Sequence, residues 1–130
     1  MTPNEYQEAT CHTAVYDKAI FGLLPAYPNA HFPTNANETL KLSYVALGLA
    51  GEAGEFANKV KKVIRDKGGA ANLSPDDYDQ LAKELGGVQW YLAQCALQIG
   101  RSLEEIMQLN LDQLESRKGR GTLSGSGDDR

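Results

Sequence analysis

The sequence predicts an all-α domain with four helices, at about 3–19, 38–67, 75–99 and 103–117. Three stretches have the pattern of a helix start, and apolar residues then recur at steps of three and four. No stretch alternates apolar and polar residues with period two, as a half-buried strand would. With 130 residues, the chain is long enough for one core, so we expect a single domain over 1–130.

Capping residues mark where the first, third and fourth helices begin. In each, a side-chain hydroxyl is followed three residues later by a carboxylate, so that the two can bond each other's backbone N–H groups. Proline occupies the first helical position in two of them, where its missing N–H costs little. The pairs are Thr2 with Glu5, Ser74 with Asp77, and Ser102 with Glu105.

The second helix contains Gly48, Gly51 and Gly54, although each interior glycine costs about 1 kcal/mol relative to alanine. We expect these glycines to permit close approach of another backbone. The helix should end at the pair Gly68-Gly69. The apolar residues of the third helix are Leu81, Leu85, Val88, Leu92, Cys95 and Ile99, and those of the fourth are Leu103, Ile106, Met107, Leu111 and Leu114.

Two segments lack helical patterning. The stretch 22–37 is rich in proline and asparagine and is predicted to be a loop. The Gly/Ser-rich end, 119–130, resembles either a disordered tail or a short C-terminal arm.

Composition excludes some partners. A net charge of −4 and a pI near 5.1 argue against binding to a nucleic-acid backbone, which needs a basic surface. No uncharged run is long enough to span a membrane. Cys11 and Cys95 are predicted to be free thiols, and with no signal peptide after Met1 we expect a cytoplasmic protein.

Three glutamates are the candidate site. Glu52 and Glu55 lie three residues apart and share one face of the second helix, while Glu84 lies on the third. Converging carboxylates are the ligands that Mg²⁺ prefers. Lys59 continues the same face and could bind phosphate. An ordinary solvated stripe of charged residues has the same spacing, so the pattern alone leaves both interpretations open.

Two segments carry a family resemblance. Gly48-Leu-Ala-Gly51-Glu52-Ala-Gly-Glu55 and Lys83-Glu84-Leu-Gly-Gly87-Val-Gln-Trp90-Tyr91 resemble the MazG-like all-α nucleoside triphosphate pyrophosphohydrolases, whose signature is Glu-x-x-Glu followed by Glu-x-x-Asp. The 28 residues between Glu55 and Glu84 fit that family's spacing, and likeness extends to both ends of the chain.

The resemblance implies hydrolysis of a (d)NTP to a (d)NMP and pyrophosphate, an activity that controls the nucleotide pool. It implies Mg²⁺, with Mn²⁺ as a substitute, bound by Glu52, Glu55 and Glu84. One of the first two would also act as the base toward water. Family members assemble as homodimers or homotetramers. The residues expected to bind substrate are Lys59, Tyr91, Asn110, Arg117 and Lys118.

Some of these residues have structural interpretations as well. Tyr91 fits an ordinary core aromatic equally well, and Arg117 and Lys118 would also interact favourably with the C-terminal end of a helix dipole.

The chain departs from the family pattern at two positions. Gly87 stands where the family has aspartate, and Gln113 where lysine is common. Losing the aspartate removes one metal ligand, which water or a neighbouring carboxylate could replace. The alternative function is therefore a catalytically weak or silent nucleotide-binding or scaffold homologue. A plain helical interaction module is a third interpretation.

Overall fold

The computed structural model describes residues 1–17, 20 and 36–123. This part of the chain is helical and contains no strand, which confirms the predicted all-α fold. The predicted loop lies outside the described residues except for its last two positions, 36 and 37. The predicted C-terminal arm lies outside them beyond residue 123. The α-helices are α1 (Pro3–Thr10), α3 (Ala36–Lys67), α4 (Pro75–Gln98) and α5 (Leu103–Gly119), and the 3-10 turns are η1 (Cys11–Thr13) and η3 (Ala70–Asn72).

The first helix is shorter than predicted, because α1 ends at Thr10 rather than at residue 19. Thr10 Oγ1 donates to the Gln7 carbonyl at 2.6 Å, and Thr13 Oγ1 donates to the Thr10 carbonyl at 3.1 Å. Side-chain bonds of this kind compete with helical backbone bonds, and Thr, Cys and His are weak helix formers. The chain therefore turns through η1, and Ala14 is extended.

The other helix limits agree with prediction to within two residues, which is the usual uncertainty of helix ends. All three capping boxes are present, with both reciprocal hydrogen bonds in each. The pairs are Thr2 with Glu5, Ser74 with Asp77, and Ser102 with Glu105.

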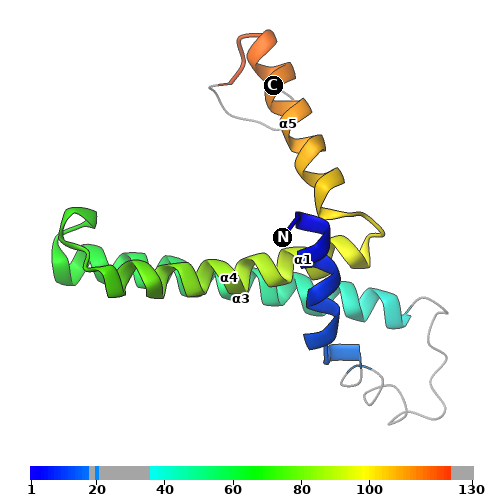
Figure 1. The fold of residues 1–130 in the computed structure, drawn as a ribbon, viewed down its shortest axis with the longest axis horizontal. Coiled ribbons are helices and arrows are strands. Elements are labelled where there is room, and N and C mark those ends of the chain that lie inside the picture. The colour runs from blue at the N-terminus through cyan, green and yellow to red at the C-terminus, as the bar shows by residue number, and fades with distance from the viewer. Residues whose placement is uncertain (18–19, 21–35, 124–130) are drawn as a thin grey trace.

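The helices α3 and α4 run antiparallel, side by side, and form a long hairpin (Figure 1). As predicted, α3 ends before Gly68-Gly69. Gly68 has φ 73° and Gly69 has φ 117°, a region of backbone space that glycine enters without a steric penalty. The sharp turn brings α4 back along α3.

The helices α1 and α5 meet at the other end of the hairpin, against α4. Gln7 joins them, because its Nε2 donates to the Arg101 carbonyl at 2.9 Å and its Oε1 accepts from the Leu103 N–H at 3.0 Å. Leu103 packs on Ala93 and Ala96 in a buried cluster. Beyond this first turn, α5 extends away from the hairpin (Figure 1).

A second buried cluster consists of Tyr16, Ile20 and Val45. A polar network lies beside it: the Tyr16 hydroxyl donates to Gln94 Oε1 at 2.9 Å, and Gln94 Nε2 donates to Thr10 Oγ1 at 2.7 Å. Gln94 is 1% exposed, so these bonds satisfy groups that water cannot reach. They tie the segment after α1 to α4.

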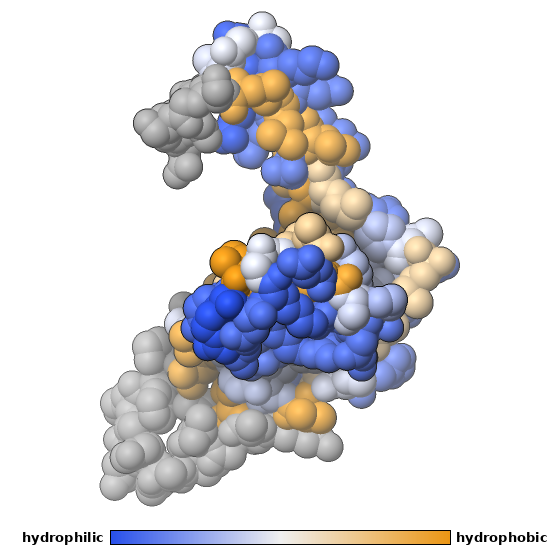
Figure 2. All heavy atoms as spheres, turned by 90° about the vertical axis from the view of Figure 1, so that its left-hand side faces the viewer, coloured by the Kyte–Doolittle hydropathy of each residue, from blue (hydrophilic) through white to orange (hydrophobic). Residues whose placement is uncertain are grey.

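Much of the apolar surface is exposed in the single chain. Of the predicted α4 stripe, Leu92 and Cys95 pack against the buried clusters, whereas Leu85 and Ile99 are exposed. Figure 2 shows hydrophobic side chains gathered along α5, while the connection end of the hairpin is hydrophilic. The α5 apolar face consists of Met107, Leu111 and Leu114.

None of the helices in the described part is long and apolar enough to cross a membrane.

Candidate functional site

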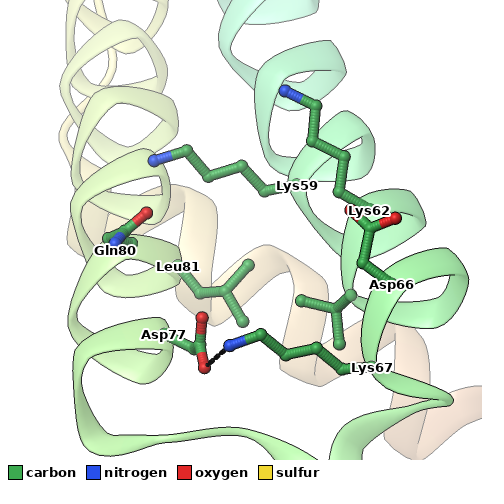
Figure 3. Close-up of a pocket in the computed structure, with 8 residues that line it drawn as sticks. Lys59, Lys62, Asp66, Lys67, Asp77, Gln80 and Leu81 are labelled. Carbon is green, nitrogen blue, oxygen red and sulfur yellow. Dashed lines mark hydrogen bonds and ion pairs between the residues drawn. The ribbon is translucent and has the colours of Figure 1, made fainter.

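A pocket of about 180 Å³ opens between α3 and α4 near the hairpin connection (Figure 3). Lys67 and Asp77 form an ion pair on one side of it. The Lys67 ammonium, together with Ser74, lowers the pKa of the Asp77 carboxyl to about 2. The lining residues are Lys59, Lys62, Val63, Asp66, Lys67, Asp77, Gln80 and Leu81.

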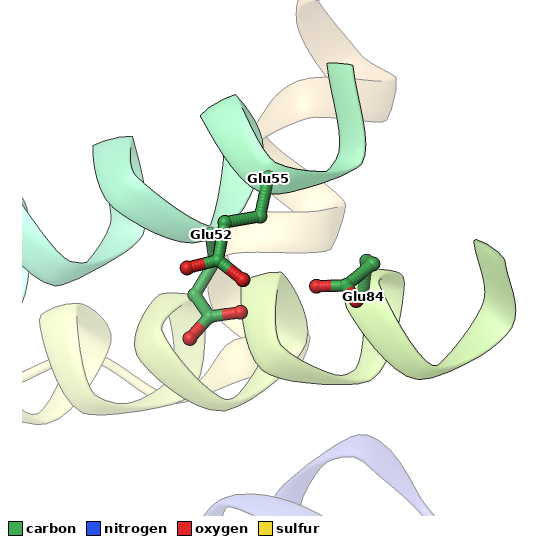
Figure 4. Close-up of side chains that lie close together, drawn as sticks. All are labelled: Glu52, Glu55 and Glu84. Carbon is green, nitrogen blue, oxygen red and sulfur yellow. The ribbon is translucent and has the colours of Figure 1, made fainter. Parts of the chain in front are cut away.

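The three predicted glutamates converge beside this pocket (Figure 4). Glu52 and Glu55 come from α3 and Glu84 from α4, and one carboxylate oxygen of each lies within 4.8 Å of the others. The spacing of three places the first two on one helix face, and the antiparallel hairpin brings the third opposite them. Glu52 and Glu84 are partly buried, and Glu55 is exposed. We call these residues the carboxylate cluster.

Lys59 is the cation that contacts the carboxylate cluster. Its Nζ lies 2.6 Å from Glu84 Oε1, and the two side chains are 33% and 14% exposed. Glu52 and Glu55 form no ion pair with any described residue. Three carboxylates that have one ammonium partner among the described residues repel one another, and a hard divalent cation that takes oxygen ligands would relieve that repulsion. The residues present therefore fit such an ion.

The glycines of α3 and α4 have different surroundings. A Cβ on Gly48 would lie 2.0 Å from Cε1 of Tyr91, so Gly48 permits the close approach of a side chain rather than of the predicted backbone. Within the described part of the chain, a Cβ on Gly51 or Gly54 would have no neighbour within 4 Å, so no backbone approaches these two there. A Cβ on Gly87 would lie 2.1 Å from Oε2 of Glu52. The carboxylate of Glu52 thus occupies the space where a side chain at 87 would be.

Tyr91 lies close to the cluster. Its ring packs on the Gly48 backbone and makes an edge contact with Trp90, with ring centroids 4.8 Å apart. Burial raises the pKa of the Tyr91 hydroxyl, and the nearby Tyr44 hydroxyl and Glu52 charge act in the same direction. Tyr44 was not singled out from the sequence. Its position eight residues before Glu52, on the same side of α3, was the available signal.

The other predicted substrate-binding residues lie on α5. Asn110 and Lys118 are exposed and Arg117 is partly buried. Because α5 contacts α1 and α4 only near its own start and then leaves the hairpin, the single chain does not bring these three residues to the carboxylate cluster.

Comparison with known proteins gives a consistent result. The MazG nucleotide pyrophosphohydrolase domain matches residues 41–121, which include the whole carboxylate cluster. The Gene 37 protein of Mycobacterium phage L5 is 54% identical over 89 residues, which cover 68% of this chain and 76% of the phage protein. No solved structure shows significant similarity. The chain belongs to the MazG nucleotide pyrophosphohydrolase family.

Proposed function

We propose that the protein is a Mg²⁺-dependent nucleoside triphosphate pyrophosphohydrolase that converts a (d)NTP to a (d)NMP and pyrophosphate. Membership of the family supports hydrolysis of a nucleotide pyrophosphate bond. The observation that carries the proposal for this chain is the convergence of Glu52, Glu55 and Glu84 within 4.8 Å. A site of this composition suits phosphoryl chemistry, which depends mostly on positioning and on neutralising charge.

The carboxylate cluster would hold Mg²⁺, or Mn²⁺ in its place. The bound ion would neutralise charge on the phosphate oxygens and fix their position. Glu52 or Glu55 would orient the attacking water and accept its proton, since neither is engaged by a cation among the described residues. Tyr91, next to Glu52, is placed to contact the nucleoside by stacking or through its hydroxyl.

Lys59 would exchange partners during substrate binding. Its ammonium pairs with Glu84 and also lines the polar pocket, so phosphate oxygens that enter the pocket can compete for it. Lys62 lies further along the same pocket. We propose that this side of the hairpin receives the part of the polyphosphate that leaves as pyrophosphate.

Replacing Lys59 with methionine is expected to have opposite effects on two ligands. The free protein should bind Mg²⁺ more tightly, because Glu84 loses an internal cation. The KM for the nucleotide should rise about tenfold, because a hydrogen bond to a charged group is lost. Calorimetry with Mg²⁺ and steady-state kinetics would measure the two effects. Lys61→Met, an exposed lysine on the same helix, is the matched control; equal behaviour of the two variants would contradict the role of Lys59.

The α5 residues require a second chain if they act at the site. We propose a homodimer or homotetramer that buries the α5 apolar face, so that Asn110, Arg117 and Lys118 approach the cluster of a neighbouring subunit. The apolar face is exposed in the single chain, which supports this arrangement. Light scattering after size exclusion should show an oligomer for the wild type and a smaller species for Leu111→Glu. A wild type that stays monomeric at high concentration would refute the assembly.

Pyrophosphate release tests the proposed activity directly. A panel of ribo- and deoxyribonucleoside triphosphates is incubated with protein and Mg²⁺, and monophosphate and pyrophosphate are quantified. At least one substrate should give equal amounts of both, and EDTA should stop the reaction. No release from any nucleotide would remove the catalytic claim. Nucleotide binding without release would instead favour the weak or silent homologue, the alternative that Gly87 supports because the family aspartate is missing there.

A further inference from the structure

We infer that Gly87 helps to assemble the carboxylate cluster: because it has no side chain, the carboxylate of Glu52 on the opposite helix can occupy the space where a side chain at 87 would lie. The inference rests on the proposed metal-dependent function. It assigns Gly87 as a positioning residue for a ligand set of three carboxylates, rather than as a defect in a set of four.

Backbone conformation does not explain the glycine at 87. Positive φ occurs among the described glycines at Gly68, Gly69, Gly100 and Gly121, and Gly87 is not one of them. It lies well inside α4, where alanine would be the better helix former. What distinguishes Gly87 is instead the space that it leaves.

The atoms nearest to that space belong to a single side chain. The three heavy atoms nearest to a Cβ on Gly87 would all belong to Glu52: Oε2 at 2.1 Å, Cδ at 2.6 Å and Cγ at 3.3 Å. No backbone atom is among them. A larger residue at 87 would therefore have to displace the carboxylate of Glu52.

The position of this contact gives it a role in the cluster. Gly87 follows Glu84 by three residues, so the two share one face of α4. Glu52 reaches that face from α3, and its carboxylate remains within 4.8 Å of the oxygens of Glu55 and Glu84. Displacing the Glu52 side chain would thus move one carboxylate away from the other two, although the residue itself would still be present.

Gly86 provides a matched control. It is also an interior glycine of α4 without positive φ, but a Cβ there would have no neighbour within 4 Å among the residues that the structure describes. Gly86→Ala and Gly87→Ala make the same chemical change on adjacent residues, and both should keep the helical circular dichroism spectrum and melt no lower than the wild type. The two variants differ only in whether the new methyl group meets Glu52.

The test is Mn²⁺ binding measured by calorimetry on the free protein, without nucleotide. Gly87→Ala should weaken binding about ten- to hundredfold, as is usual when a group that orients a metal ligand is changed. Gly86→Ala should stay within about twofold of the wild type. If both variants bind like the wild type, the inference is overturned and the proposed function stands. If the wild type itself binds no Mn²⁺, both are overturned.

A coupling measurement separates this contact from a general disturbance of the helix. Glu52→Asp shortens the side chain by one methylene and makes room for a Cβ at 87. Gly87→Ala should therefore weaken Mn²⁺ binding by a smaller factor in the Glu52→Asp background than in the wild type, because contacting residues are not additive. Equal factors in the two backgrounds would show that Gly87 does not act through Glu52 and would overturn the inference.

Discussion

Glutamine at position 84 is expected to lower kcat/KM for nucleotide hydrolysis by a factor on the order of 10³, or about 4 kcal/mol. Glu84 is the member of the carboxylate cluster that α4 supplies, and its side chain is 14% exposed. Glutamine keeps the size of the side chain but removes the charge that would bind the cation and hold Lys59 at 2.6 Å. Steady-state kinetics over a range of Mg²⁺ concentrations would measure the effect.

A melting experiment supplies an independent readout for the same variant. A ligand that binds only the folded protein stabilises it by about 2.7 kcal/mol at a hundred times its Kd. Mg²⁺ should therefore raise the melting temperature of the wild type clearly and that of Glu84→Gln little. Asp79→Asn, an exposed carboxylate on the same helix, should behave like the wild type in both assays. Wild-type kinetics in Glu84→Gln would contradict the proposed site.

Replacing Gln94 with leucine is expected to lower the free energy of unfolding by about 2–3 kcal/mol, because two buried polar groups each lose a hydrogen bond. The Tyr16 hydroxyl, in a residue that is 4% exposed, would lose its acceptor, and Thr10 Oγ1 would lose a donor. Urea denaturation followed by circular dichroism would measure the loss. Gln89→Leu changes an exposed glutamine of α4 and should shift stability by about 0.5 kcal/mol or less.

A double-mutant cycle tests the cause of that loss. Tyr16→Phe removes the hydroxyl whose proton Gln94→Leu would leave without its acceptor. The double variant should therefore be less destabilised than the sum of the two single variants. Strict additivity would show that the hydrogen bond between Tyr16 and Gln94 does not account for the effect.

The fold was predictable where local signals are strong. Capping boxes depend on residues three apart, and a glycine pair ends a helix by its own backbone freedom, so Ser74, Ser102 and Gly68-Gly69 placed their helix ends correctly. The end of α1 was predicted wrongly. Threonine hydroxyls bond to backbone carbonyls both within helices and after their ends, so the sequence does not show where the helix stops. The direction of α5 depends on tertiary contacts, which periodicity does not contain.

The convergence of the three glutamates was predictable from the sequence, but the details of their geometry were not. Helical spacing and the family resemblance identified Glu52, Glu55 and Glu84, and the structure brings them together. Spacing could not show that Glu52 lies over Gly87, since that contact depends on the separation and register of two helices. The apolar pattern around Asn110 could not show that this residue is exposed on α5. Such a pattern does not say whether the surface that packs against the helix belongs to the same chain.

The hairpin also has a consequence for the order of folding. All three carboxylates lie within the segment 36–98, whose two helices are joined by a short turn. Gln7, in contrast, bonds to Arg101 and Leu103, which lie 94 and 96 positions further along the chain. Contacts between distant residues require a larger loop-closure entropy and form more slowly. We therefore expect the carboxylates to come together while the two ends of the chain are still apart.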